Sequence, residues 1–336
     1  MRTSSWQHRY FKKAFGGLLA GVMMGLSGFP ATAGAQAYPG NKPIKMVIPW
    51  PAGGVTDAAG RILAKQLSES MSVPVVVENR PGANGLIGAD YVAKSAPDGY
   101  TLFLATAETH AINPYIYSKL PYDPIKDFVA VAPFAINPFT VTVRSGIPAS
   151  TMKEAVELAQ KSPGKLTNAS WGIGSSSQII MEMVKKQAKV DILHIPFQGE
   201  APAVTALMGD QVDFMVLPAA RAESFSKDGR VKVLATTTAE RAWLLPDVPT
   251  LKEQGYNVDV ANWFGLVAPA GTPEDVIDVL NAAVAKLLQG EPLPKALREL
   301  GVDMHPVMNP AEFQAFIVNE GKRWGPVIRE ANIHLD

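Results

Sequence analysis

The sequence predicts an α/β protein with a mainly parallel sheet, because short apolar runs of strand length alternate with segments of helical periodicity. The 336 residues include 47% apolar side chains, enough for about two domains with cores of their own. Two of the strand-like runs end in a glycine turn that leads into a helix. Ligands of such sheets bind beyond the carboxyl ends of the strands, so we expect a binding site there.

The first 37 residues are predicted to be a secretory signal peptide. They begin with a basic segment, continue through an uncharged apolar run over residues 14–29 and end in the A-x-A site Ala35-Gln36-Ala37. The run is shorter than the ~20 apolar residues of a membrane span, and a retained anchor helix is the alternative. Without this segment the chain has 27 basic and 31 acidic side chains, a formal net charge of −4.

Composition restricts the location and the partners. Because the chain contains no cysteine, it can form no disulfide or zinc–thiolate site, and it lacks the thiol that carries a lipoprotein anchor. We therefore expect a free periplasmic protein. The 31 basic and 31 acidic residues of the whole chain balance, so nothing indicates nucleic acid or a membrane surface as a partner.

The first glycine turn follows a strand predicted over residues 44–48. Pro49 and Pro51 end this strand, and Thr56 or Asp57 is predicted to cap a helix that runs to about residue 70. Free N–H groups and the helix dipole would then converge on one point, which suits an anion, although an ordinary βα turn is the alternative. The ligand-binding residues predicted in this turn are Trp50, Gly53, Gly54, Val55, Thr56 and Asp57.

A second loop at the same sheet edge is predicted after a strand over residues 100–105, which follows a strand over 73–78. Its predicted ligand-binding residues are Thr106, Ala107, Thr109 and His110. Two longer apolar runs, residues 134–143 and 258–268, are candidate crossovers between two domains. They divide the chain into one domain of residues 38–138 plus 264–336 and another of residues 139–263.

The second domain repeats the pattern of a strand, a glycine turn and a helix start. A strand over residues 166–170 leads into a glycine turn, and residues 175–177 start a helix to about residue 188. Gly172 and Gly174 resemble the start of a dinucleotide fingerprint, but Ser177 stands where the third glycine is needed, so we predict no nucleotide cofactor. Buried strands are also predicted over 191–196 and 211–217. The predicted ligand-binding residues of this domain are Ser170, Trp171, Gly172, Ser175, Ser176, Gln198, Leu217 and Pro218.

Helix starts are predicted from capping residues at Thr151, with Glu154, at Thr272, followed by Pro273, and at Asn309.

No residue pattern indicates catalysis. The five histidines form no HExxH motif or i,i+4 pair, no G-x-S-x-G elbow occurs, and paired carboxylates cannot be identified. We predict no metal, no cofactor and no catalytic residue.

With these residues, the chain resembles the Bug family, the periplasmic solute receptors of tripartite tricarboxylate transporters. The segments that carry the resemblance are YP (38–39), KPI (42–44), PWPAGGVTD (49–57), VVVENRPGA (75–83), APDGYTL (96–102), HAINP (110–114), LPYDP (120–124), GSSS (174–177), LPDVPT (245–250) and WFGL (263–266). The resemblance implies a two-lobed periplasmic binding protein of the Venus-flytrap, type II-like kind, with two crossover segments. It also implies that the 49–57 loop holds one carboxylate of a small ligand, often through bridging waters, and that a membrane permease receives the ligand.

Several positions depart from the pattern of the family. Members often have phenylalanine in place of Trp50, a small or polar residue in place of Trp171, and histidine in place of Gln178. Many have a polar residue where Leu217 and Pro218 stand. Two tryptophans in the cleft would favour an aromatic or long-chain carboxylate over citrate, unless Trp171 packs as core.

We therefore expect a monomeric receptor for a small carboxylate, more specifically a dicarboxylate, with either an aromatic or an aliphatic body. An exported enzyme acting on a small carboxylate is the alternative, and a periplasmic ligand sensor for a signalling partner is compatible with the receptor. Asp57 is expected to organise the first loop instead of holding a cation, and Arg221 is expected to be a surface residue.

Overall fold

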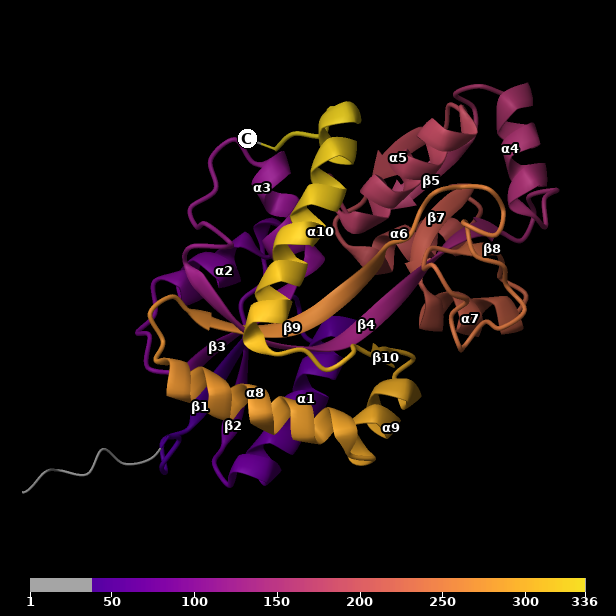
Figure 1. The fold of residues 1–336 in the computed structure, drawn as a ribbon. Coiled ribbons are helices and arrows are strands. Elements are labelled where there is room, and N and C mark those ends of the chain that lie inside the picture. The colour runs from indigo at the N-terminus through magenta and orange to yellow at the C-terminus, as the bar shows by residue number, and fades with distance from the viewer. Residues whose placement is uncertain (1–37, 336) are drawn as a thin grey trace, which may run out of the picture. The chain divides into compact units, whose positions relative to one another are not determined.

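The computed structural model describes residues 38–335, so the predicted signal peptide lies outside the described residues. Within this range ten strands form one mixed sheet in the order β2-β1-β3-β9-β4-β7-β5-β6, with β8 and β10 also pairing with β4 (Figure 1). The described residues belong to one compact unit. No helix in this range has the length and apolarity needed to cross a membrane.

The bounds of the elements are as follows. The strands are β1 (Ile44–Ile48), β2 (Val75–Asn79), β3 (Thr101–Thr106), β4 (Phe128–Arg144), β5 (Thr167–Ser170), β6 (Leu193–Pro196), β7 (Phe214–Pro218), β8 (Val231–Thr236), β9 (Ala261–Pro269) and β10 (Asp303–Met304). The α-helices are α1 (Val55–Met71), α2 (Leu86–Ala93), α3 (Asn113–Ile116), α4 (Met152–Lys161), α5 (Ser176–Ala188), α6 (Glu200–Met208), α7 (Ala219–Lys227), α8 (Glu274–Gln289), α9 (Pro292–Glu299) and α10 (Pro310–Glu330). A 3-10 turn, η1 (Ala83–Gly85), and a π-helix, η2 (Glu108–Ile112), complete them.

The first half-sheet comprises β2, β1, β3, β9, β10 and the first part of β4. Strands β1, β2 and β3 are parallel, whereas β9 is antiparallel to both β3 and β4. The apolar stripe of α1, with Leu63 and Leu67 one turn apart, packs in one core with Leu280 of α8 and Met46 of β1.

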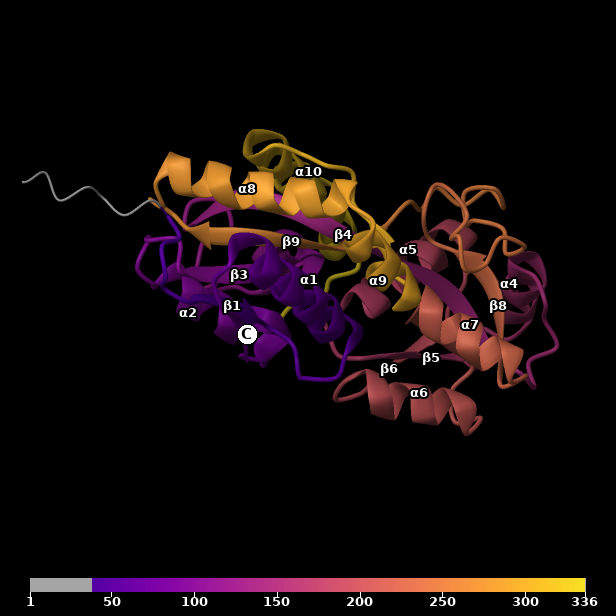
Figure 2. The same cartoon turned by 90° about the horizontal axis from the view of Figure 1, so that it is seen from below.

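The second half-sheet comprises the rest of β4 with β7, β8, β5 and β6. Strands β7 and β8 are antiparallel to β4, and β5 is parallel to both β6 and β7. Figure 2 shows α6 on one side of β5 and β6. The predicted strand over 191–196 exists as β6, but it is an edge strand and not buried, since 52% of Leu193 is exposed.

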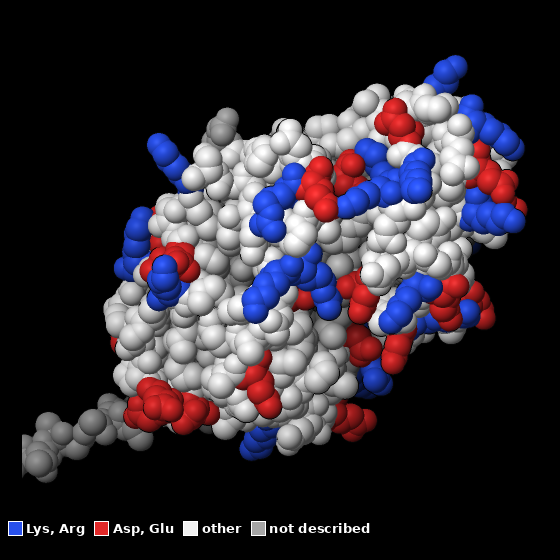
Figure 3. Space-filling view, turned by 45° about the horizontal axis from the view of Figure 1, so that its top comes forward, with Lys and Arg blue, Asp and Glu red and all other residues white. Residues whose placement is uncertain are grey.

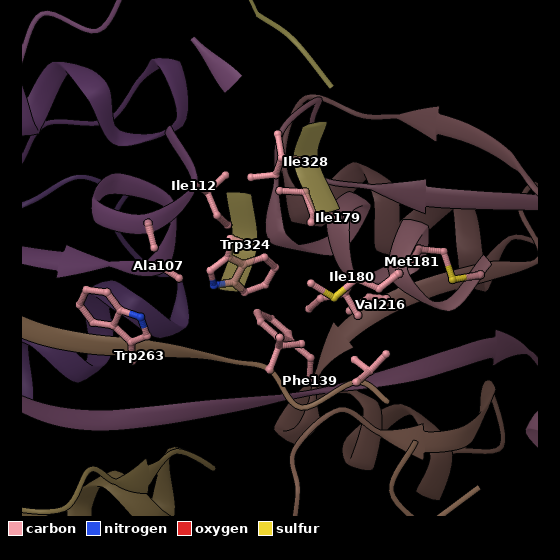
Figure 4. Close-up of a cluster of buried hydrophobic side chains, with 14 of the residues drawn as sticks. Ala107, Ile112, Phe139, Ile179, Ile180, Met181, Val216, Trp263, Trp324 and Ile328 are labelled. Carbon is pink, nitrogen blue, oxygen red and sulfur yellow. The ribbon is translucent and has the colours of Figure 1, made fainter. Parts of the chain in front are cut away.

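The prediction of a mainly parallel sheet was wrong, because the two predicted crossover runs are long strands that run against their neighbours. Strand β4 contributes to both half-sheets, and β9 lies beside it (Figure 1). Their pairing places Asn137 opposite Asn262. One hydrophobic cluster contains Ala107 and Ile112 from the first half as well as Ile179 and Val216 from the second (Figure 4). The division into two lobes at residues 138/139 and 263/264 stays a prediction.

The helix starts were predicted with mixed success. The caps at Thr151 and Asn309, each with its capping box, are confirmed. The N-cap of α1 is Gly54, not Thr56 or Asp57, because the helix already begins at Val55. Similarly, α8 is capped by Pro273, and the Thr272 hydroxyl instead donates to the Pro269 carbonyl.

Four helices and strands were missed and one loop was assigned wrongly. No sequence pattern had predicted α3, α7, α9 or β10. The polar loop predicted over 106–110 does not exist as a loop, since Thr106 ends β3 and residues 108–110 form the first part of η2. On the face drawn in Figure 3, Lys and Arg side chains are interspersed with Asp and Glu side chains.

Candidate functional site

A pocket of about 710 Å³ is lined by residues from both half-sheets. The loops after β1 and β2 and the start of η2 contribute from the first half-sheet, and the loops after β5, β6 and β7 contribute from the second. Strands β4 and β9 pass beneath. The lining residues are Trp50, Pro51, Ala52, Gly53, Gly54, Val55, Thr56, Pro81, Gly82, Ala83, Asn84, Glu108, Asn137, Phe139, Trp171, Gln198, Gly199, Glu200, Ala201, Pro202, Pro218, Arg221 and Asn262.

The N-terminus of α1 opens onto this pocket. Gly53 has a φ of +88°, which favours glycine, and a Cβ atom there would meet nothing within 4 Å. Its cap, Gly54, contributes no side chain, and the first N–H groups of a helix have no partner inside the helix. Gly54, Val55 and Thr56 therefore bring backbone N–H groups that have no partner among residues 38–335, and the positive end of the helix dipole, to the pocket surface, whereas the Gly53 N–H is donated to Asp57.

Asp57 holds this loop from behind and does not line the pocket. Its carboxylate accepts the Gly53 N–H at 2.9 Å, the Arg61 Nε–H at 3.0 Å and the Asn79 Nδ2–H at 2.7 Å. Burial opposes ionisation of Asp57, but these hydrogen bonds and the Arg61 charge outweigh it and lower the pKa of the carboxyl group. The carboxylate thus fixes the position of the loop.

The N-terminus of α5 is occupied by protein groups. The Ser175 Oγ caps the helix by accepting the Gln178 N–H at 3.4 Å, and the Gln178 Oε1 accepts the Gly174 N–H at 2.8 Å. The Ser176 Oγ donates to the Glu108 Oε1 at 2.7 Å. The two helix starts therefore differ: the start of α1 lines the pocket, whereas the start of α5 is buried and its side chains bond to other protein groups.

Glu108 and two asparagines form a polar cluster in the pocket. The Glu108 side chain is almost wholly buried, and besides Ser176 it accepts the Asn262 Nδ2–H at 3.1 Å. The Asn262 Oδ1 accepts the Ala107 N–H at 3.2 Å, which fixes the orientation of its amide. The Asn137 Oδ1 is buried and has no hydrogen-bond partner among residues 38–335.

Three aromatic side chains form the apolar wall: Trp50, Phe139 and Trp171. The rings of Phe139 and Trp171 lie 5.8 Å apart between centroids, at an interplanar angle of 35°. Trp171 is half-buried and also packs against the core, so the two interpretations offered for it each describe part of its surroundings.

An ion pair lies on the side of the pocket that the second half-sheet forms. The Arg221 Nε lies 2.6 Å from the Glu200 Oε1, and both residues line the pocket. Burial raises the pKa of Glu200, and the nearby Arg221 charge opposes this effect. Arg221 was expected to be a surface residue, and 43% of its side chain is exposed, but because α7 begins directly after β7 it also lines the pocket.

Of the residues predicted to bind ligand, the structure brings eight to the pocket surface. These are Trp50, Gly53, Gly54, Val55, Thr56, Trp171, Gln198 and Pro218. The others lie behind it, because they cap helices, bond within their own loops or pack in the core; they are Asp57, Thr106, Ala107, Thr109, His110, Ser170, Gly172, Ser175, Ser176 and Leu217.

His110 illustrates this displacement. Because η2 is helical, the side chain is turned into the core, where its ring packs on Phe103 and Phe128 and its Nδ1 lies 2.9 Å from the Thr109 Oγ1. Burial lowers the pKa of His110 to about 3. It lines a different cavity, of about 750 Å³, beside α3 and α10.

Sequence reasoning missed the polar residues of the pocket floor. Glu108 is the third residue after a predicted strand, in a loop at the expected binding edge, where an acidic side chain is a usable signal. Asn137 and Asn262 each interrupt a long apolar run, and a polar residue at such a position indicates a functional role. Within residues 38–335 no group of three or more His, Cys, Asp or Glu side chains could hold a metal ion.

The fold is α/β, its mixed sheet has two halves joined by long strands, and a pocket lies between the loops of the two halves. These features define the class of two-lobed solute-binding proteins. Within this class the chain belongs to the tripartite tricarboxylate transporter family receptors, whose family model matches residues 59–333. It is 33% identical to the protein BugT of Bordetella pertussis, over 94% of this chain and 97% of BugT.

Solved structures support the same assignment. The R. palustris protein Rpa4515, solved with adipate, superimposes with a TM-score of 0.81 at 32% identity, covering 88% of this chain and 99% of that one. MatC of Rhodopseudomonas palustris, solved with bound malate, gives 0.76 at 33% identity, covering 85% and 98%. The periplasmic binding protein BugD gives 0.77 at 33% identity, covering 87% and 98%. The predicted family and fold class are therefore confirmed.

Proposed function

We propose that this protein is a periplasmic receptor that captures a small carboxylate and delivers it to the permease of a tripartite tricarboxylate transporter. The observation that carries the proposal is the open start of α1, where Gly53, Gly54, Val55 and Thr56 line the pocket while Asp57 is held behind them. Export by residues 1–37 and action as a monomer are parts of the same proposal.

The binding strength can be worked out from these donors. A carboxylate on backbone N–H groups gains charge-assisted hydrogen bonds of roughly 1.5–3 kcal/mol each. Two or three such bonds, together with burial of the ligand body and less the cost of ordering ligand and lobes, bring a Kd of about 1 μM within reach. No arginine is required for this end of the ligand.

The walls favour a ligand with an apolar body. Trp50, Phe139 and Trp171 offer flat surfaces, and covering one aromatic face is worth roughly 1–2 kcal/mol at about 25 cal/mol per Å². Adipate and malate, the ligands of the two related structures, are both aliphatic dicarboxylates. We propose a carboxylate with an aromatic or extended aliphatic body for this chain.

A thermal-shift screen tests the proposal. The purified mature chain is tested against mono- and dicarboxylates of two to ten carbons and against benzene carboxylates, with the matching primary amides as uncharged controls. A ligand at 100 times its Kd should stabilise the protein by about 2.7 kcal/mol, and its amide should not. If no carboxylate in the panel shifts the melting temperature, the proposed ligand class is wrong.

Delivery to a permease requires a separate experiment. A strain that lacks this receptor should lose uptake of the identified ligand at concentrations near the Kd. Reintroduction of the wild-type chain should restore uptake, whereas a variant that folds but does not bind should not. Unchanged uptake in the deletion strain would contradict the transport role while leaving ligand binding intact.

A further inference from the structure

The polar cluster of the pocket has an excess of hydrogen-bond acceptors. Glu108 is 1% exposed and lines the pocket, and its two partners, the Ser176 hydroxyl and the Asn262 amide, are neutral. Among the ion pairs of residues 38–335, none involves Glu108. A buried carboxylate without a cation is unfavourable unless a positive group is supplied from elsewhere.

Asn137 gives an independent indication in the same place. It is 4% exposed, it lines the pocket, and its Oδ1 has no hydrogen-bond partner in the part of the chain that the structure describes. The β4–β9 register sets Asn137 opposite Asn262, which holds Glu108. A buried amide oxygen without a partner calls for a donor, and only a ligand or a water in the pocket can provide one.

Residues 38–335 do not themselves provide the missing positive charge. Among them, Arg221 is the one Lys or Arg side chain in the pocket lining, and it is paired with Glu200 at 2.6 Å. The Ser176 hydroxyl at the start of α5 donates to Glu108, and Ser176 and Ser177 are fully buried and do not line the pocket, so this helix start is not available to a second ligand carboxylate. Such a carboxylate would also meet the like charge of Glu108.

From this arrangement we infer that Glu108 is a specificity-determining residue, and that the ligand joins a carboxylate to a hydrogen-bond-donating cationic group, an ammonium. The carboxylate binds at the start of α1, as in the proposed function on which this inference rests. The ammonium donates to Glu108 and to the Asn137 Oδ1. The pocket is thus polarised, positive at α1 and negative at Glu108, and it selects an aminocarboxylate over a dicarboxylate of the same length.

Two series of matched compounds test this inference by calorimetric titration. The aromatic series is 4-(aminomethyl)benzoate, terephthalate and 4-methylbenzoate, and the aliphatic series is 5-aminopentanoate, glutarate and pentanoate. Within each series only the end group changes, from ammonium to carboxylate to methyl. In at least one series the wild-type protein should bind the ammonium compound at least tenfold more tightly than both others.

The substitution Glu108→Gln preserves the shape of the side chain and removes its charge. It should weaken binding of the ammonium compound at least tenfold and should leave binding of the dicarboxylate equal or tighter. Glu320→Gln is the matched control, because it is the same substitution at another buried glutamate, 5% exposed, which does not line the pocket. This control should keep the preference for ammonium within threefold of the wild-type value.

The outcomes separate the two proposals. If dicarboxylates bind more tightly than their ammonium analogues in both series, the role of Glu108 is wrong and the carboxylate receptor stands. If the wild-type protein binds no compound of either series or of the carboxylate panel, both are wrong. The comparison of compounds on the wild-type protein decides the matter even if Glu108→Gln does not fold.

Discussion

Replacing Asp57 with alanine should destabilise the native state by about 2–4 kcal/mol. The change removes the carboxylate that accepts the Gly53 N–H at 2.9 Å and the Asn79 Nδ2–H at 2.7 Å, each worth roughly 1.5–3 kcal/mol as a hydrogen bond to a charged group. The ion pair with Arg61 adds at most about 1 kcal/mol, because 49% of the Arg61 side chain is exposed. The desolvation that burial imposes on the carboxylate is relieved, which reduces the sum.

Urea unfolding at neutral pH measures this loss, and the melting temperature should fall by roughly 3–6 °C. Affinity for a carboxylate should also fall, because the loop that carries Gly53 loses its anchor. Glu223→Gln is the control: Glu223 makes an ion pair with Lys227 at the same i,i+4 spacing on α7, but it holds no loop, and its loss should cost less than about 0.5 kcal/mol.

The pH dependence gives a stricter test of the same reasoning. The pKa of Asp57 is lowered in the folded state, so unfolding takes up a proton near the ordinary value of 3.8. The stabilisation is therefore complete above this pH and is lost as the pH falls through the folded pKa. The difference in stability between wild type and Asp57→Asn should shrink below about pH 4. A difference independent of pH, or tighter carboxylate binding by Asp57→Ala at unchanged stability, would refute the proposed role of Asp57.

Three further predictions concern single residues. Trp171→Ala should weaken binding of a benzene dicarboxylate about tenfold and of succinate far less. Trp243 is exposed, and Trp243→Ala should affect neither ligand. Equal losses of affinity for the two ligands would contradict a contact between the ligand and the aromatic wall. Gly60→Ala should cost about 1–3 kcal/mol in urea unfolding, because its Cβ would come within 2.6 Å of buried side chains of β1 and β3, while Gly290→Ala, with 3.4 Å to its nearest neighbour, should be near neutral. Burial lowers the pKa of His110 to about 3, so below about pH 6.5 this histidine takes up a proton in the unfolded state and not in the folded state. The free energy of unfolding should therefore decrease by up to about 1.4 kcal/mol for each unit that the pH falls between these two values. His110→Gln should flatten this slope.

Local sequence patterns predicted those helices and strands whose ends are set by residues close in the sequence. The strand over 44–48 and the capping box at Asn309 depend on neighbouring residues only, and the structure has both. Strand direction depends on where the chain returns in space, and no local pattern distinguishes an antiparallel β9 from a parallel strand. This is why the sheet was predicted as mainly parallel.

The candidate site was predicted well at α1 and less well elsewhere, for a physical reason. The N-cap Gly54 has no side chain that could bond the first N–H groups of α1, so these groups stay available to the pocket. Ser175 and Thr109 carry hydroxyl groups that the protein itself uses, one to cap α5 and the other to close the turn after β3. A small polar residue in a loop therefore indicates a bond but not which partner takes it.

The place of β9 in the chain has a consequence for folding. Strand β3 ends at Thr106, but its pairing partner on that side, Leu266 opposite Leu104 for example, lies more than a hundred and fifty residues later. A nascent chain that stops short of β9 leaves the hydrogen-bonding edge of β3 open, and β4 without its longest neighbour. Strands so distant in sequence pair slowly, because the chain loses the loop-closure entropy before any stabilising contact between them has formed. The first half-sheet, although it begins the sequence, can be completed only after nearly the whole chain is available.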